Sequence, residues 1–565
     1  MIIVADEDQI HSNLEIADRL SSVAQLLSTD KANLYKKKAY RRAANTIRGL
    51  GESVNELVRR NADLTVYPGI GKAISGAIRE IVLTGTLATL EKLRSDASPE
   101  LLSINDYPKL DPRRVQRVYT RLHISSIDSL REALENGDIE RVLGSRMAQH
   151  VRQGLTASGA ILLYQGHDLA GSVKEYLLKQ STASRVEAVG DYRRRVETIE
   201  ELSFIVLADH FERVIERMRR YGGQTPLIEA TDDSALFSLA AGPLLRINLA
   251  ERRNWGLSLI QRTGSEAHLK KLRRITGSLS ALKLTASFPS EQSFYDHFGL
   301  RFIDPELREG IDEVQQARDG TLPVLVTEND IRGDLHLHTD ASDGSNSIEQ
   351  MVAAAQEKGY AYIGITDHSQ SLKIAGGLPP ERLWNQIRII DRLNERFNGI
   401  RILKSAEVDI LADGSLDYLD DLLRELDYTV CSVHSRFALG REQQTERIMR
   451  AMDNRYFTIL GHATGRLLLK RPGYEVDINR IVAHAKENGC YFEINSSPDR
   501  LDLSAKNARI AAAAGVLIAV STDAHSTHEL DTVRFGIEQA RRAGLEKALV
   551  LNCQPIETLT KLFRR

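Results

Sequence analysis

The chain has 565 residues, too many for one hydrophobic core, so three or more domains are expected. It carries 75 lysines and arginines against 77 acidic residues, which excludes a polycation and confines any nucleic-acid binding to local patches. Three cysteines without CxxC spacing argue for a reducing compartment and against both a disulfide framework and a zinc ribbon. An acidic N-terminus without signal-peptide order, and the lack of a membrane-length apolar run, predict a cytoplasmic protein without membrane contact.

Hydrophobic patterns divide the chain into several predicted parts. Apolar residues at steps of three and four predict helices up to about residue 160, and β-branched runs then predict a mixed α/β region. Polar helices follow, and from Gly333 short apolar strands alternate with helix-length segments. The predicted domains are 1–88, 89–160, 161–255, 256–320 and 333–565, with a linker at 321–332.

The first motif along the chain is LTVYPGIGKAISGAIREIV, in which a tight glycine hairpin separates two predicted helices. Glycine permits the turn and leaves N–H groups exposed at the start of the second helix, where a DNA phosphate can dock. The stretch looks like a helix-hairpin-helix motif, and the alternative is an ordinary packing corner between helices. The motif predicts DNA contacts from Gly69, Gly71 and Lys72.

A glycine turn and three consecutive arginines precede a strand in GDYRRRVETIEELSFIV. That layout suits a grip on a nucleotide or on a phosphate backbone, and we predict that Arg193, Arg194 and Arg195 bind DNA. A phosphate site that performs chemistry usually also needs paired carboxylates to hold metal ions. The strand begins with Glu201 and Ser203 instead, which leaves two interpretations: a working active site, or the frame of one whose chemistry has been lost.

Histidines and acids recur at the ends of seven predicted strands in 333–565. Strands that alternate with helices predict parallel βαβ units, here a barrel, whose active site lies at the C-terminal ends of the strands. Imidazole mixed with carboxylate suits Zn, Mn or Fe, and two or three such ions can clamp a phosphate. A lone histidine at a strand end is more often a structural residue, but this recurrence favours a metal site. The candidates are His336, His338, Asp343, Asp367, His368, Glu407, Asp409, His434, His462, Asp523 and His525.

The motifs HLHTDASDG, ITDHS, EVDIL, SVHS, GHATGR, EINSSPDRLDL and STDAH resemble those of the polymerase and histidinol phosphatase (PHP) domain, from Gly333 to the end. The resemblance implies a (β/α)7 barrel with a trinuclear metal cluster that cleaves phosphoesters, and Glu407 as the bridging carboxylate. The implied ligands are His336, His338, Asp343, His368, Glu407, His434, His462, Asp523 and His525. Arg466, four residues after His462, is either a phosphate contact or an ordinary surface arginine.

The order of these parts resembles that of bacterial family X DNA polymerases, over nearly the whole chain. The resemblance implies a multidomain α+β and α/β protein with a helix-hairpin-helix domain at 1–88, a fingers-like domain at 89–160, a palm-like nucleotidyltransferase domain at 161–255, a thumb-like domain at 256–320 and the PHP barrel at 333–565. Some relatives use a Schiff-base lysine to excise sugar phosphates. The matching position is Ala77, which argues against that lyase activity, although Lys72 is near it in sequence.

The palm-like domain departs from the family pattern at the residues that perform nucleotidyl transfer. In the family a Gly-Ser turn and an arginine pair bind the triphosphate, and three aspartates hold two magnesium ions. Here Asp191 stands for the serine, Glu201 and Ser203 for the aspartate pair, and Asn248 for the third aspartate. One carboxylate in place of three is too few for two magnesium ions, which predicts a degenerate polymerase site.

The favoured function is therefore a DNA-binding, metal-dependent phosphodiesterase that removes nucleotides or blocking groups from 3′ ends in DNA repair. The expected substrates are gapped, nicked or single-stranded 3′ ends, the expected cofactors are two or three Mn, Zn or Fe ions, and the expected state is a monomer. Three alternatives stay open: residual gap-filling synthesis, a histidinol-phosphatase-like enzyme for small molecules, and a DNA-binding scaffold without activity.

Overall fold

The computed structural model describes residues 13–27, 34–48, 50, 53–95, 112–124, 126–155, 159–179, 182–221, 225–239 and 242–564. Part of the predicted fingers-like domain, 96–111, lies outside these residues. The chain forms two compact units. The first holds Met1–Arg193, Thr198–Ser265 and Arg273–Phe298, and the second holds Arg194–Glu197, Glu266–Leu272 and Gly299–Arg565. The turn Arg194–Glu197 thus belongs to the second unit although its neighbours in sequence belong to the first.

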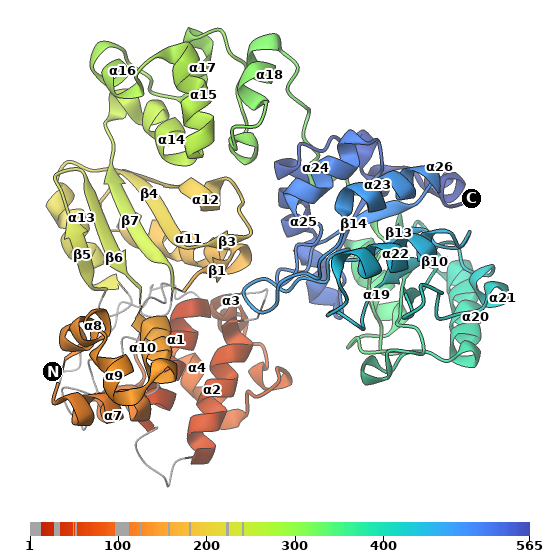
Figure 1. Cartoon of the computed structure of the whole chain (residues 1–565), viewed down its shortest axis with the longest axis horizontal. Coiled ribbons are helices and arrows are strands. Elements are labelled where there is room, and N and C mark those ends of the chain that lie inside the picture. The colour runs from red at the N-terminus through yellow and green to blue at the C-terminus, as the bar shows by residue number, and fades with distance from the viewer. Residues whose placement is uncertain are drawn as a thin grey trace. The chain divides into compact units, whose positions relative to one another are not determined.

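Helices build the N-terminal part of the first unit (Figure 1). Those described are α1 (Asn13–Leu26), α2 (Leu34–Arg48), α3 (Val54–Arg59), α4 (Lys72–Thr84), α5 (Ala88–Ser95), α7 (Pro112–Leu122), α8 (Ile127–Glu135), α9 (Asp138–Leu143) and α10 (Ser145–Leu155). A 3-10 turn, η3 (Leu64–Val66), and a glycine hairpin connect α3 to α4. No described helix is by itself long and apolar enough to cross a membrane, and one bent pair, Lys72–Thr84 with Ala88–Arg94, meets the criterion by length and composition only.

A five-stranded mixed sheet follows, with strand order β2-β4-β7-β6-β5. The elements of this region are β1 (Ile161–Leu162), α11 (Leu163–Leu178), β2 (Arg185–Val189), α12 (Gly190–Arg193), β3 (Thr198–Ile199), β4 (Glu201–Leu207), α13 (Phe211–Met218), β5 (Leu227–Ala230), β6 (Ser234–Ser238) and β7 (Leu244–Leu249). The interior strand β4, between β2 and β7, is apolar on both faces: Phe204 packs with residues of α11 and α13, whereas Ile205 packs with Trp255.

Short helices connect this sheet to the last part of the chain, as the polar helical pattern predicts. They are η6 (Arg252–Asn254), α14 (Trp255–Thr263), α15 (Glu266–Thr276), α16 (Leu279–Thr285), α17 (Glu291–His297), η7 (Pro305–Leu307), α18 (Glu313–Asp319) and η8 (Glu328–Asp330). Serine residues are the N-caps of α16 and α17: Ser278 Oγ accepts from Ala281 N, and Ser290 Oγ accepts from Ser293 N.

Parallel strands that alternate with helices form most of the second unit, as predicted. The strands are β8 (Gly333–Asp334), β9 (Tyr362–Ile365), β10 (Arg401–Lys404), β11 (Glu407–Asp409), β12 (Val430–Ser432), β13 (Ile459–Leu460), β14 (Tyr491–Asn495) and β15 (Ile518–Ser521). The helical segments are α19 (Ile348–Glu357), η9 (Lys373–Ala375), α20 (Pro380–Arg396), α21 (Asp420–Leu423), α22 (Arg441–Met452), α23 (Ile478–Glu487), α24 (Ala505–Ala513), η10 (Thr527–Thr532), α25 (Val533–Arg542), η11 (Lys547–Leu549), η12 (Leu551–Cys553) and α26 (Ile556–Phe563).

The parallel strands form two sheets, of order β10-β9-β8 and β11-β12-β13-β14-β15. The segment predicted as one strand, IRILKSAEVDIL, is divided between β10 and β11 and so contributes to both sheets. Isolated parallel bridges join Leu337, after β8, to Ala524, after β15, and His368, after β9, to Glu407 in β11. Closure into one barrel remains a prediction.

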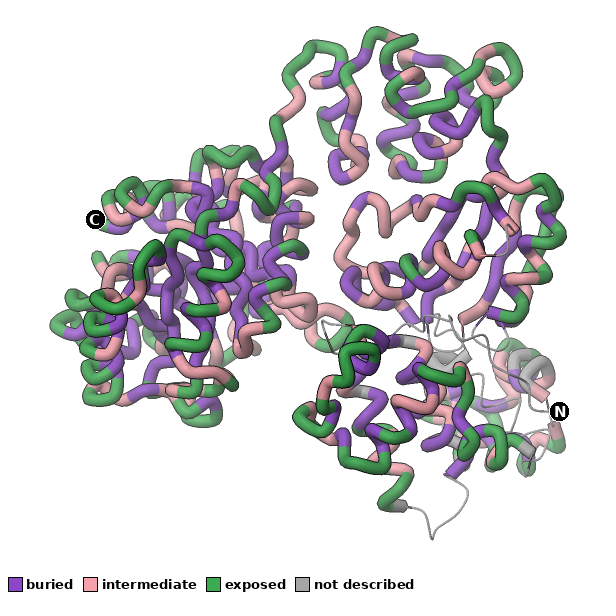
Figure 2. The backbone as a smooth tube through the Cα atoms, turned by 180° about the vertical axis from the view of Figure 1, so that it is seen from behind, coloured by how far each residue is buried: buried purple, intermediate pink, exposed green. Residues whose placement is uncertain are grey.

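The interior of this unit holds two apolar clusters. Its strands are buried almost throughout, whereas the helices around them alternate between buried and exposed stretches (Figure 2). One apolar cluster includes residues from α19, α20, α22, α23, α24 and α25 together with the strands. The metal-ligand candidates therefore stand on a rigid, closely packed framework.

Gly364 in β9 has no room for a side chain. A Cβ atom at this position would lie 1.8 Å from Tyr428 Oη, and that hydroxyl donates to Leu335 O at 2.7 Å. We expect Gly364→Ala to destabilise the protein by about 1–3 kcal/mol, because Tyr428 must move and lose its acceptor. Urea unfolding should show the loss, while Gly440→Ala, whose Cβ would meet no atom within 4 Å, should leave the midpoint unchanged. Equal midpoints for both variants would contradict this packing.

Candidate metal centre

The predicted ligands converge in the second unit because the parallel strands end on one side. His336 and His338 follow β8, His368 follows β9, and the other histidines and Asp523 follow β12, β13 and β15. Asp343 lies in the loop after His338, and Glu407 begins β11. Side chains at the C-terminal ends of parallel strands meet at one edge, so this arrangement follows from the topology.

Glu407 lies at the middle of the group and is 1% exposed. Its Oε2 is 2.7 Å from His368 Nδ1 and 3.6 and 3.7 Å from the Nε2 atoms of His336 and His338. Its Oε1 is 2.9 Å from His462 Nε2. One carboxylate therefore faces imidazoles from several strands with both of its oxygens, the geometry of a bridging ligand.

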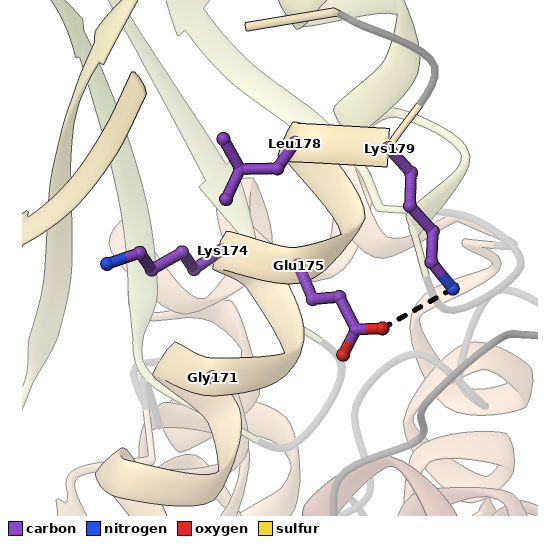
Figure 3. A pocket seen from close by; sticks show the side chains of 5 residues that line it. All are labelled: Gly171, Lys174, Glu175, Leu178 and Lys179. Carbon is purple, nitrogen blue, oxygen red and sulfur yellow. Dashed lines mark ion pairs between the residues drawn. The ribbon is translucent and has the colours of Figure 1, made fainter. Parts of the chain in front are cut away.

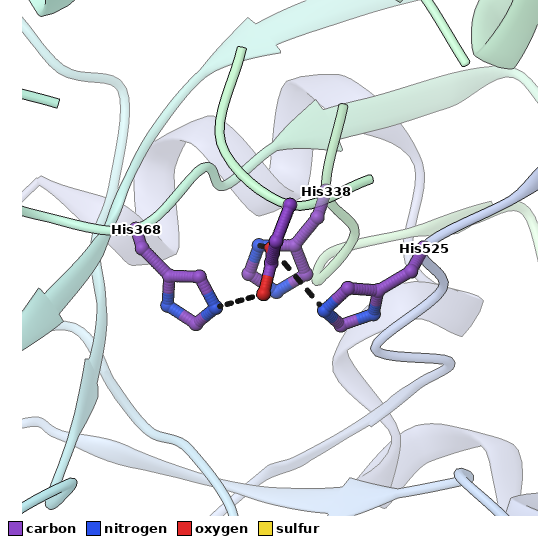
Figure 4. A group of neighbouring side chains, drawn as sticks. His338, His368 and His525 are labelled. Carbon is purple, nitrogen blue, oxygen red and sulfur yellow. Dashed lines mark ion pairs between the residues drawn. The ribbon is translucent and has the colours of Figure 1, made fainter. Parts of the chain in front are cut away.

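Asp343 forms the second focus of the site. Its carboxylate is 3.5 Å from His368 Nε2, 3.4 Å from His525 Nε2 and 3.9 Å from His338 Nδ1. Figure 4 shows the imidazoles of His338, His368 and His525 gathered close together, with dashed lines marking ion pairs within the group. Asp523 joins the group through Oδ1, which lies 3.1 Å from His338 Nε2.

Several buried donor atoms of this group lie close together without a hydrogen bond between them, as is expected of metal ligands. Atoms within 4.8 Å of one another form three groups: His338, Asp343, His368 and His525; His336, His338 and Glu407; and His368, Glu407 and His434. His368 Nδ1 and Glu407 Oε2 are buried and only 2.7 Å apart, yet neither makes a hydrogen bond. His336 Nε2 and His338 Nδ1 are also buried without a hydrogen bond. Buried donors that converge without pairing are what a cation site requires.

Oxygen atoms behind the imidazoles hold their orientation. Glu493 Oε1 lies 2.7 Å from His336 Nδ1, and Asp409 Oδ1 lies 2.6 Å from His434 Nδ1. The Asp523 carbonyl lies 2.8 Å from His525 Nδ1. Each contact occupies Nδ1 and leaves Nε2 for the centre, which fixes the tautomer that binds a metal.

The electrostatics of the centre favour a cation among carboxylates. Burial and the neighbouring imidazoles of His368 and His525 lower the pKa of His338 to about 3, so His338 is neutral at neutral pH and offers a lone pair. Burial opposes protonation of His368 as well, but Glu407 and Asp343 outweigh it and raise the pKa of His368 to about 10. Glu407 and Asp343 favour a positive charge on His368, and a bound metal ion can supply that positive charge instead.

Two arginines lie at the edge of the centre in different roles. Arg500 Nε is 3.3 Å from Asp523 Oδ2, at the metal-ligand candidates themselves. Arg466, the predicted phosphate contact, points its guanidinium at the backbone of the Arg500 loop, donating from Nε to Arg500 O at 3.0 Å. Sequence reasoning missed Arg500, which stands in the quoted motif EINSSPDRLDL.

Glu493 was missed for a different reason. Its alternation with Asn495 in YFEIN places both on one face of β14, but the partner of Glu493 is 157 residues away in sequence. Asn495 Nδ2 donates to Asp523 Oδ2 at 3.0 Å. The alternation of Glu493 with Asn495 was the signal that the sequence offered. Neither residue type nor spacing identified Glu493 as the group that orients His336.

Comparison with known proteins identifies two parts of the chain. The PHP domain matches residues 334–497, and a helix-hairpin-helix domain matches residues 11–87. The DNA polymerase/3′-5′ exonuclease PolX of Bacillus subtilis is 32% identical over 98% of this chain and 99% of its own length. This chain belongs to the PolX family. Probable phosphatases of Thermoanaerobacter sp. and Shewanella sediminis match 39% and 41% of the chain, at 31% and 26% identity over 89% and 94% of their own lengths.

At the predicted polymerase triad positions of this PolX relative, the remaining carboxylate contacts a serine and an arginine. Glu201 accepts from Ser203 Oγ at 2.6 Å and lies 3.1 Å from Arg246 Nε. Arg246 stands directly across from Ser203 in the pairing of β4 with β7, and it also lies 3.1 Å from Glu229 Oε1. Asn248 is buried and donates to Phe204 O at 3.0 Å. Sequence reasoning singled out Asn248 and missed Arg246, whose cation lies beside the remaining carboxylate.

The arginine turn of this family member is bound to carboxylates. Within the first unit, Arg193 lies 2.6 Å from Glu291. Within the second, Arg194 lies 3.2 Å from Glu309, and Arg195 lies 3.2 Å from Glu538. These contacts neutralise the guanidinium groups that we predict to bind DNA. DNA binding by this turn remains a prediction and requires that the carboxylates be exchanged for phosphates.

The helix-hairpin-helix residues of the chain lie at the start of α4. Gly71 is the N-cap of α4, and both Gly71 and Lys72 are exposed. Gly69 has a φ of 82°, and a Cβ there would lie 2.5 Å from the side chain of Arg42 in the basic helix α2. The hairpin and the basic helix therefore lie side by side.

A shallow depression of about 430 Å³ lies along α11 in the first unit (Figure 3). Gly171, Lys174, Glu175, Leu178 and Lys179 line it, and Lys179 lies 3.4 Å from Glu175. It contains none of the predicted ligands, and its lining offers a single carboxylate. The depression is therefore not the predicted metal site.

Replacing Glu493 should weaken metal binding without removing a ligand. Glu493→Gln loses the charge behind His336 Nδ1, and we expect metal affinity to fall by about 10- to 100-fold. Elemental analysis after dialysis against graded metal concentrations measures the change. Glu487→Gln, an exposed residue at the end of α23, is the matched control and should bind metal as the wild type does. Identical affinities for the two variants would show that Glu493 does not support His336.

Proposed function

We propose that this chain is a metal-dependent exonuclease that removes nucleotides from the 3′ ends of DNA. The observation that carries the proposal is the convergence of eight nitrogen- and oxygen-bearing side chains on the group around Glu407. It lies in the part that matches the PHP domain, in a chain related over nearly its full length to a protein named as a 3′-5′ exonuclease. The proposed substrates are gapped, nicked or single-stranded 3′ ends, and the proposed state is a monomer.

The proposed ligands of two or three Mn, Zn or Fe ions are His336, His338, Asp343, His368, Glu407, His434, His462, Asp523 and His525. When bound, such ions lower the pKa of water and neutralise phosphate oxygens. Glu407 holds the centre together through both of its oxygens. Glu493 and Asp409 fix the orientation of two of the imidazoles, which keeps the donors preorganised. Arg500 offers a guanidinium to the phosphate at the edge of the site.

The helix-hairpin-helix is the proposed sequence-independent grip on the DNA backbone. Gly71 and Lys72 present exposed backbone and charge at the N-terminus of α4, which suits a phosphate oxygen. The neighbouring helix α2 adds the exposed cations Lys36, Lys38, Arg41 and Arg42. The arginine turn Arg193–Arg195 contributes if phosphates replace its carboxylate partners.

The five-stranded sheet and the helices that follow it are proposed to be a palm and thumb without polymerase activity. Two magnesium ions need several anionic ligands, and here Glu201 already faces the guanidinium of Arg246. A divalent ion would have to displace that cation and then find no second carboxylate at Ser203. Asp191, in place of the serine expected in the triphosphate turn, adds repulsion towards a nucleotide.

A second candidate function is a phosphatase that acts on small phosphorylated molecules. Probable phosphatases match 39% and 41% of the chain, and the match covers 89% and 94% of their own length. The helix-hairpin-helix at residues 11–87 favours DNA over such substrates. Turnover of a phosphorylated alcohol, measured beside degradation of single-stranded DNA, separates the two functions, because a preference for the alcohol would overturn the first.

Loss of one ligand should abolish hydrolysis. His338→Ala removes a donor that faces both Asp343 and Asp523, and we expect degradation of a 3′-labelled single strand to fall by about 1000-fold or more. Binding to the same strand, measured by fluorescence anisotropy, should change little. His484→Ala serves as control. His484 lies in α23, outside the centre, and pairs with Asp453 after α22. Full activity in His338→Ala would contradict the proposal.

Primer extension tests the degenerate palm. With either magnesium or manganese, we expect no template-directed incorporation, because Glu201 and Arg246 leave no divalent site. The Bacillus subtilis relative, named as a DNA polymerase, supplies the positive control. Incorporation that Ser203→Ala abolishes would show that the palm is active.

A further inference from the structure

Arg500 has a guanidinium that is only partly used inside the protein. It lies in the loop after β14, its Nε is 3.3 Å from Asp523 Oδ2, and its side chain is 23% exposed. Apart from this contact, the described residues give the guanidinium no hydrogen bond or ion pair. A guanidinium fixed at one nitrogen and open at the others presents the fork that binds two phosphate oxygens.

A second arginine holds the loop that carries Arg500. Arg466 donates from Nε to Arg500 O at 3.0 Å and from Nη2 to Leu501 O. Leu501 is buried with a φ of 43°, a left-handed conformation that is strained for a residue other than glycine. Contacts from outside the loop must sustain this conformation, and Arg466 supplies two of them.

Arg466 is held in turn by Glu197, in the turn Arg194–Glu197 of the same unit. Glu197 Oε1 lies 3.2 Å from Arg466 Nη2, and Oε2 lies 2.8 Å from Arg542 Nη1. The carboxylate is 16% exposed. Burial opposes its ionisation, but the guanidinium groups of Arg542 and Arg466 outweigh burial and hold the pKa of Glu197 below its ordinary value. Glu197 is therefore a charged clamp between two arginines at neutral pH.

We propose that Glu197 is a positioning residue for the phosphoesterase: it holds Arg466, which sets the loop from which Arg500 binds the phosphate of the DNA end. This rests on the proposed function, since it assigns roles within the same site. Only Arg500 lies against a metal-ligand candidate, so only Arg500 is assigned a contact with substrate. Glu197 and Arg466 act through the backbone of the loop. A segment next to the degenerate triphosphate turn would thereby serve the exonuclease.

Steady-state kinetics on a single-stranded 3′ end test this chain of contacts. Arg500→Ala should raise KM by about 10- to 100-fold, the worth of a charge-assisted contact, with little change in kcat or metal content. Glu197→Ala should raise KM by a smaller factor. In the double variant the Glu197 substitution should add nothing, because the residue it acts through is gone. Full multiplication of the two factors would overturn the proposal.

Glu538→Gln is the matched control for the turn. Arg195 belongs to the same turn as Glu197, and the substitution removes the carboxylate that lies 3.2 Å from Arg195. It leaves the contact between Glu197 and Arg466 in place. It should not raise KM, because an Arg195 freed from its carboxylate can only add to DNA binding. A rise in KM equal to that of Glu197→Ala would mean that any loosening of the turn has this effect, and the specific role of Glu197 would be refuted.

Hydrogen exchange over residues 497–503 supplies a measurement that needs no activity. Glu197→Ala should speed exchange in this loop by several-fold, and Glu538→Gln should not. Unchanged exchange in Glu197→Ala would overturn the positioning role, whatever the kinetics show. If the wild type fails to degrade DNA while exchange in Glu197→Ala is faster, the proposed exonuclease fails and the clamp on the loop is supported.

Discussion

The second unit depends on one buried charge, the carboxylate of Glu407. A carboxylate that is 1% exposed is stable only if cations or strong donors surround it, because burial of an unpaired charge costs several kcal/mol. Imidazoles from strands spread over more than 100 residues meet at this group, which is possible because parallel strands end on the same side. The topology and the centre are thus mutually dependent: the strands deliver the donors, and the donors make the buried acid tolerable.

The first unit meets the same requirement with a different cation. Glu201 is the remaining carboxylate at the polymerase triad positions, and the guanidinium of Arg246 satisfies it from the neighbouring strand. An arginine is a permanent cation with directed donors, so it stabilises the sheet and cannot exchange as a metal ion does. The two buried or half-buried carboxylates are therefore satisfied differently: Glu407 by a cluster of imidazoles that could hold metal ions, and Glu201 by a fixed ion pair.

The sequence predicted what local patterns encode. Alternation in DLHLHT placed His336 and His338 on one face, and donors at successive strand ends identified the centre. It could not show pairings between distant segments: Glu493 with His336, Arg246 with Glu201, or the arginine turn with acids far along the chain. Such pairs depend on tertiary packing, and a charge run reads the same whether it faces DNA or a carboxylate. The division of one predicted strand into β10 and β11 was not visible in the sequence either, because the apolar pattern continues across the break.

Backbone conformation sets a further limit on what sequence patterns reveal. His462 and Asp523, both ligand candidates, have φ values of 24° and 56°, and Leu501 beside Arg500 has 43°. Residues other than glycine adopt this region only when surrounding contacts over-determine them. Those contacts are present: Glu493 accepts from His462 N at 2.8 Å, His336 O accepts from Asp523 N at 2.8 Å, and Arg466 binds the carbonyl of Leu501. The geometry of the centre therefore depends on groups behind the ligand candidates: Glu493 contacts His336 directly, whereas Glu197 contacts Arg466, which in turn binds the Arg500 loop.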